Sequence, residues 1–74
     1  MKVELKLFAS LRKYGPAQEE IELAEGATVG DLLERLGVPP SEVAIALVNG
    51  RHAHNELPLC DGETLALFPP IAGG

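Results

Sequence analysis

The chain has 74 residues and 46% of them are hydrophobic, which predicts one small globular domain. No apolar run approaches the roughly 20 residues of a membrane-spanning helix, and a net charge of −5 argues against nucleic acid, whose binding depends on basic side chains. The single cysteine, Cys60, and the lack of an apolar leader after Met1 favour a cytoplasmic protein with no membrane partner.

The first elements in chain order are two strands. Apolar and charged residues alternate over 2–7 and again over 20–23, which is the period of a half-buried strand. Residues 10–17 contain Gly-Pro and predict the turn between them. We expect the two strands to pair as an antiparallel hairpin.

A short helix is predicted next, over residues 29–36. Thr28 has the right chemistry for an N-cap, and Asp31 places negative charge in the first turn. Gly37 can adopt the left-handed conformation that ends a helix, and two prolines follow it. The apolar residues form a single stripe that we expect to pack on one face of a sheet: Val29, Leu32, Leu33 and Leu36.

Three further strands are predicted in the second half of the chain. The continuous apolar run over 44–48 is typical of a central strand. Asn-Gly at 49–50 is a strong hairpin signal, so 51–54 would be a short polar return strand. After a turn at 61–62, residues 64–68 form the last strand.

This order of elements predicts an α+β fold in which one main helix covers one face of a mixed sheet. The expected closure is the β-grasp, with the first and last strands side by side in the middle. We expect a single β-grasp domain over 1–68. Residues 69–74 would be a flexible C-terminal tail that leaves a central strand, and its two prolines would stiffen the stem.

Three side chains in the second half could carry chemistry. His52 and His54 would point to the same side of the strand 51–54 and could share a metal, but a third ligand would require a favourable loop around Glu56 or Cys60. Solvated histidines on an edge strand are the expected state, so we predict no metal site. Cys60 is expected to be an incidental small residue, because nothing nearby except those histidines would lower its pKa.

The C-terminal sequence Pro-Pro-Ile-Ala-Gly-Gly over 69–74 suggests chemistry of another kind. Glycines lack a Cβ atom, so they can enter a channel too narrow for any side chain. A carboxylate is inert toward nucleophiles until it is activated. Reaction with ATP would convert the carboxylate of Gly74 into an acyl-adenylate, which a sulfur donor or an amine could attack. Such a protein is a carrier that supplies the reactive atom, while its partners supply catalysis.

Three stretches point to a known family. They are the ending Leu-Phe-Pro-Pro-Ile-Ala-Gly-Gly over 67–74, Phe-Ala-x-Leu-Arg over 8–12 and Pro-Leu-x-Asp-Gly over 58–62. With them the chain resembles the ubiquitin-like sulfur-carrier family, and within it the small subunit of molybdopterin synthase. The resemblance spans essentially the whole chain, although residues 52–57 match nothing in it. The related thiazole-synthesis carrier also ends in Gly-Gly but usually lacks the two prolines.

The resemblance implies a sequence of partners. A ubiquitin-activating-like enzyme would adenylate Gly74, a sulfur donor protein would supply the sulfur of a thiocarboxylate, and the large synthase subunit would use it to build the dithiolene of molybdopterin. ATP would be used by the activating partner, and no cofactor is expected on this chain. Sulfur supply for thiamine or tRNA thiolation, and attachment to protein lysines, stay open as alternatives. The tail residues that partners would contact are Pro69, Pro70, Ile71, Ala72 and Gly73.

Strand parity indicates a docking face. Phe8 and Phe68 fall on the side of their strands opposite to the residues that face the helix. If those strands are neighbours, both rings lie on the open face of the sheet, where an aromatic pair favours an interface. The alternative is that a loop covers them. Arg12, in the matched stretch 8–12, is a further candidate for partner contact.

Overall fold

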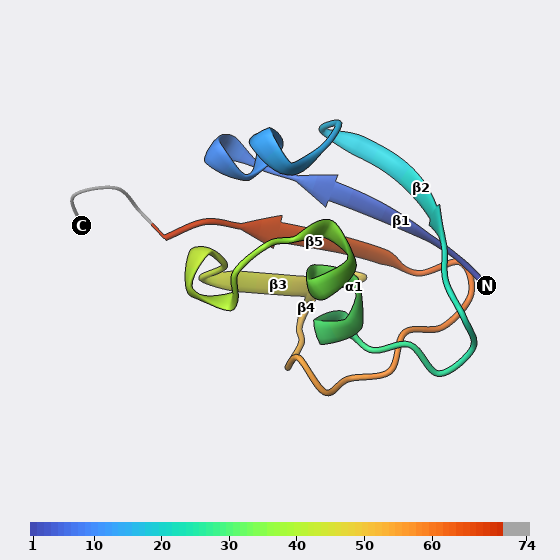
Figure 1. Ribbon diagram of the computed structural model, residues 1–74. Helices are drawn as coiled ribbons and strands as arrows, with labels where there is room; N and C mark the ends of the chain where they lie inside the picture. Colours follow the sequence, from blue (N-terminus) through green and yellow to red (C-terminus); the bar gives the residue numbers. More distant parts are fainter. Residues whose placement is uncertain (71–74) are drawn as a thin grey trace.

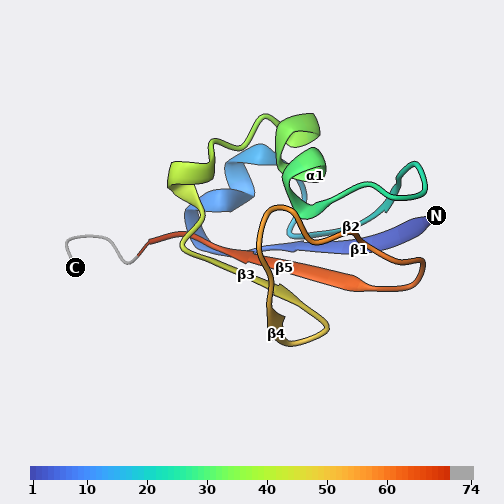
Figure 2. The ribbon, with the colours of Figure 1, turned by 90° about the horizontal axis from the view of Figure 1, so that it is seen from below.

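The computed structural model describes residues 1–70 and contains one five-stranded mixed sheet with an α-helix on one face (Figures 1 and 2). The strand order across the sheet is β2-β1-β5-β3-β4. Among the described residues, no helix has the length and apolar character needed to cross a bilayer. In chain order the elements are β1 (Lys2–Leu7), the 3-10 helix η1 (Ala9–Tyr14), β2 (Gln18–Glu22), α1 (Val29–Leu36), the 3-10 helix η2 (Pro40–Glu42), β3 (Ile45–Val48), β4 (Arg51–His52) and β5 (Thr64–Phe68).

The first and last strands lie side by side in the middle of the sheet. β1 pairs with β5 in parallel, with Leu5 opposite Leu65, and pairs with β2 antiparallel on its other side. β3 then pairs antiparallel with β5. This arrangement confirms the predicted β-grasp.

Helix α1 begins and ends where its local signals place it. The Thr28 hydroxyl accepts a hydrogen bond from the Asp31 N–H at 3.1 Å, and the Asp31 carboxylate accepts one from the Thr28 N–H at 2.9 Å. Gly37 closes the helix in the left-handed conformation, with φ of 76°. The predicted range 29–36 is therefore confirmed.

The hydrophobic core lies between the sheet and α1. Alternate residues of β1 and β5 point into it and the residues between them point to the other face, as period-two strands require. The largest fully buried side chains are Leu5, Leu7, Leu11, Leu32, Leu65, Leu67, Val3 and Val29.

The segment between β1 and β2 differs from the prediction. Instead of a simple turn over 10–17, the chain forms η1 over Ala9–Tyr14. Leu11 explains the difference, because its side chain is fully buried in the core, which places η1 over the end of the sheet. Ala9 has a left-handed φ of 53° where the chain leaves β1 and enters η1.

Candidate functional site

Phe8 and Phe68 form an aromatic stack on the sheet face opposite α1. Their ring centroids are 4.4 Å apart and the ring planes differ by 10°. The backbone explains the contact, since the Phe8 N–H donates to the Leu67 carbonyl at 3.2 Å and so extends the β1–β5 pairing by one residue. Both rings are half-buried, and they lie on the open face that strand parity predicts.

An apolar hollow of about 440 Å³ surrounds this stack. Ile45 enters it from the start of β3, opposite Phe68 in the β3–β5 register. Ile45 is 40% exposed, and in the described chain only Leu57, at 39%, is a large hydrophobic residue with comparable exposure. We call Phe8, Ile45 and Phe68 the aromatic surface; the rest of the hollow is lined by Ala9, Ser10, Pro69 and Pro70.

The aromatic surface adjoins the end of β5. Pro69 and Pro70 follow Phe68 directly and form one wall of the hollow. The predicted tail residues Ile71, Ala72, Gly73 and Gly74 lie outside the described residues. Figure 1 shows that η1, the start of β3 and the end of β5 share one end of the molecule.

Arg12 follows two residues after Ser10, which lines the hollow. It belongs to η1, is exposed, and its Nε donates to the Leu7 carbonyl at 3.4 Å. That bond holds the base of the side chain against the end of β1. Arg12 does not line the apolar hollow, and its contact with a partner stays a prediction.

A polar cluster joins η1 to η2. The Tyr14 hydroxyl donates to Glu42 Oε2, and Lys13 Nζ lies 3.1 Å from Glu42 Oε1. The hydrogen bond from Tyr14, followed by that from Lys13, lowers the pKa of Glu42, and the bond to Glu42 raises the pKa of both Tyr14 and Lys13. Sequence reasoning missed this cluster, because no local pattern links residues 28 positions apart.

The histidines do not share a strand, so this part of the prediction is wrong. β4 ends at His52, because the next residues turn: the His54 carbonyl accepts from the Leu57 N–H at 3.0 Å. Within residues 1–70 no group of three or more His, Cys, Asp or Glu side chains is placed to hold a metal. Cys60 is exposed, and its N–H donates to the Glu63 carboxylate at 2.6 Å.

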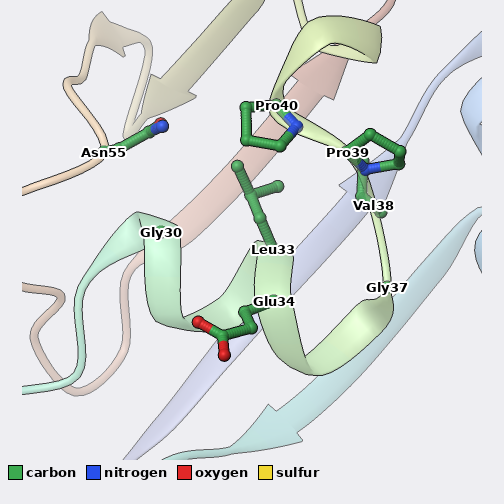
Figure 3. Close-up of a pocket in the computed structure, with 8 residues that line it drawn as sticks. All are labelled: Gly30, Leu33, Glu34, Gly37, Val38, Pro39, Pro40 and Asn55. Atoms are coloured by element: carbon green, nitrogen blue, oxygen red, sulfur yellow. The ribbon is translucent and has the colours of Figure 1, made fainter.

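A second hollow lies on the helix side of the molecule, between α1, the segment Gly37–Pro40 and Asn55 (Figure 3). Gly30 allows a close approach there: its N–H donates to the Asn55 carbonyl at 2.8 Å, and a Cβ atom would lie 3.2 Å from that oxygen. Figure 3 shows Leu33 pointing toward Pro40. Glu34 is the one ionisable residue in its lining, so the hollow offers no paired groups for catalysis.

Comparison with known proteins decides the family. The family model described as the ThiS family matches residues 5–74. The chain belongs to the ThiS family. This confirms the resemblance to ubiquitin-like sulfur carriers that the sequence motifs indicate.

Solved structures similar to this ThiS-family chain include a small archaeal modifier protein, a molybdopterin converting factor subunit and a ubiquitin. SAMP1 from Haloferax volcanii, a small archaeal modifier protein, is 31% identical with a TM-score of 0.79 over 100% of both chains. A candidate molybdopterin converting factor, subunit 1, from Pyrococcus furiosus is 34% identical with a TM-score of 0.77, covering 95% of this chain and 98% of that one. A ubiquitin from Caldiarchaeum subterraneum, at 23% identity, a TM-score of 0.65 and coverage of 100% and 98%, shows the shared fold. This ThiS-family chain is therefore a ubiquitin-like sulfur carrier or a modifier of the SAMP type.

Proposed function

We propose that this protein is the small, sulfur-carrying subunit of molybdopterin synthase, acting in the cytoplasm. The observation that carries the proposal is the aromatic surface beside Pro69-Pro70. A partner bound there lies next to the point from which the last four residues extend, and these can reach at most about 14 Å. Docking on this surface would thus hold the Gly74 carboxylate within a fixed distance of the docking site, where the partner's active site can reach it.

The chemistry takes place on Gly74 in two steps. The carboxylate attacks ATP in an activating enzyme, which gives the acyl-adenylate and releases pyrophosphate. In the second step, a persulfide on a donor protein attacks the adenylate, displaces AMP and forms an acyl disulfide. A thiol then attacks the donor's sulfur in that S–S bond, which releases the thiocarboxylate of Gly74 and leaves the donor as a disulfide. In this proposal the chain contributes the reactive group and the docking surface, and its partners supply catalysis.

Two features favour molybdopterin synthesis as the destination of the sulfur. The chain resembles the synthase small subunit in its Pro-Pro-x-Ala-Gly-Gly ending, and it is 34% identical to the candidate molybdopterin converting factor subunit. We therefore propose the large synthase subunit as the partner that receives the thiocarboxylate, in addition to the activating enzyme.

Protein modification is the second candidate function, favoured by the 31% identity to SAMP1. Activation of Gly74 would be the same. A lysine amine of a target protein, in place of sulfur, would then displace AMP and form an isopeptide bond. The two functions differ in the nucleophile that attacks the adenylate and share the aromatic surface.

Docking on the aromatic surface predicts that Phe8→Ala and Ile45→Ala each weaken binding to the large synthase subunit. Buried aromatic and aliphatic anchors at interface centres contribute about 2 kcal/mol or more, so we expect a loss of about 30-fold in affinity. Leu57→Ala is the matched control, because Leu57 is 39% exposed, close to the 40% of Ile45, but lies in a different part of the chain. Isothermal titration calorimetry, with thermal unfolding to verify folding, measures the difference. Equal affinities for all variants would contradict docking at this surface.

A further inference from the structure

The aromatic surface is assembled from three separate segments. Phe8 lies between β1 and η1, Ile45 opens β3 directly after η2, and Phe68 ends β5. β5 lies between β1 and β3 in the sheet, so Phe8 and Ile45 flank Phe68 on opposite sides. The spacing across the surface therefore depends on how the segments next to Phe8 and Ile45 are held.

Helix η1 has little stability of its own. A 3-10 helix has poorer hydrogen-bond geometry than an α-helix, and the bonds here measure 3.1 Å from the Leu11 N–H to the Phe8 carbonyl and 3.3 Å from the Gly15 N–H to the Arg12 carbonyl. Ala9, at the start of η1, has a left-handed φ of 53°, which is unfavourable for a residue with a Cβ atom. Contacts outside η1 must therefore hold it in place.

Two sets of contacts hold η1 in place and offset the strain at Ala9, whose backbone region favours glycine. One anchor that offsets this strain is Leu11, whose side chain is fully buried in the core. Glu42 supplies another, through the hydrogen bond from the Tyr14 hydroxyl and the ion pair with Lys13. Within residues 1–70, these are the only side-chain hydrogen bond and ion pair that join η1 to a segment distant in sequence.

Glu42 is also connected to the other side of the aromatic surface. It ends η2, three residues before Ile45, and the intervening Ala44 N–H donates to the Phe68 carbonyl at 2.8 Å. Figure 2 shows η1 in blue and η2 in yellow-green on the same side of the sheet as α1. Glu42 thus links the segment after Phe8 to the segment before Ile45, on the sheet face opposite the aromatic surface.

We infer that Glu42 is a positioning residue, which braces η1 against η2 and so keeps Phe8 and Ile45 at the spacing that partner docking requires. The inference rests on the proposed docking function. The brace itself is a property of this chain alone, because it depends only on contacts among Lys13, Tyr14 and Glu42. It can therefore be tested with and without a partner.

The test compares Glu42→Ala, Glu42→Gln and Tyr14→Phe with the control Glu34→Gln, which changes an exposed carboxylate on α1. The chain has two phenylalanines, so NMR of phenylalanine-labelled protein reports on the Phe8–Phe68 stack directly. We expect Glu42→Ala and Tyr14→Phe to move the ring resonances toward those of free phenylalanine. Glu42→Gln should have a smaller effect, because its amide oxygen can still accept from Tyr14. Glu34→Gln should leave the resonances unchanged.

Affinity for the large synthase subunit is measured on the same variants, and we expect a loss of about threefold to tenfold for Glu42→Ala. A lower melting temperature with unchanged ring resonances would overturn the inference, because Glu42 would then only stabilise the fold. Displaced rings with unchanged affinity would support the brace and contradict docking at the aromatic surface. The two proposals can therefore fail separately.

Discussion

Deleting Gly74 should abolish activation by the cognate adenylating enzyme while leaving the melting temperature unchanged. Among residues 1–70, the buried apolar residues lie between Val3 and Leu67, and Gly74 has no side chain that could add to a core. The reaction, in contrast, needs the terminal carboxylate at one fixed distance from the docked domain. Removing one residue shortens that distance by about 3.3–3.6 Å, whereas a misplacement of about 1 Å can cost a hundredfold in rate.

ATP–pyrophosphate exchange with the activating enzyme, together with thermal unfolding, measures both halves of this prediction. Replacing Gly73 with valine should have a similar effect, because a branched side chain would enter a channel suited to bare backbone. Ile71→Val is the matched control: it keeps the length of the tail and changes the position at which the family ending is variable. Full exchange by the shortened protein would show that Gly74 is not the reactive residue.

Leu33→Ala should destabilise the protein by about 2–5 kcal/mol, because it removes a buried side chain from the apolar stripe of α1. Leu33 is 2% exposed and belongs to the core. It also lines the hollow on the helix side, where the structure can relax around the missing atoms, so we expect a value toward the lower end of that range (Figure 3). For a small domain this is a large part of the total stability.

Leu36→Ala is the control for this prediction, since Leu36 lies on the same helix but is only partly buried. The same substitution there should cost clearly less in chemical denaturation. Equal losses at the two positions would mean that burial against the sheet does not determine the contribution of α1.

Features set by neighbouring residues could be predicted from the sequence. The Thr28–Asp31 capping box and Gly37 fix the two ends of α1 within one short stretch. Asn49 and Gly50 have positive φ of 50° and 82°, as the predicted tight hairpin requires. Parity along β1 and β5 was enough to place Phe8 and Phe68 on the same face.

Features set by distant contacts could not be predicted in this way. Helix η1 depends on the burial of Leu11, which is known only once the sheet and helix are assembled. The contacts of Glu42 with η1 join residues that no sequence period relates. The return strand was predicted too long, because the turn that begins at His54 ends β4 after two residues.

Intact-mass analysis of the protein purified from its native host tests the central claim most directly. Our account predicts a fraction of molecules whose mass differs by the replacement of one oxygen with sulfur, and fragmentation should place that change at Gly74. Isopeptide adducts to lysines of other proteins, with no thiocarboxylate at Gly74, would contradict the sulfur-carrier function and favour a protein modifier.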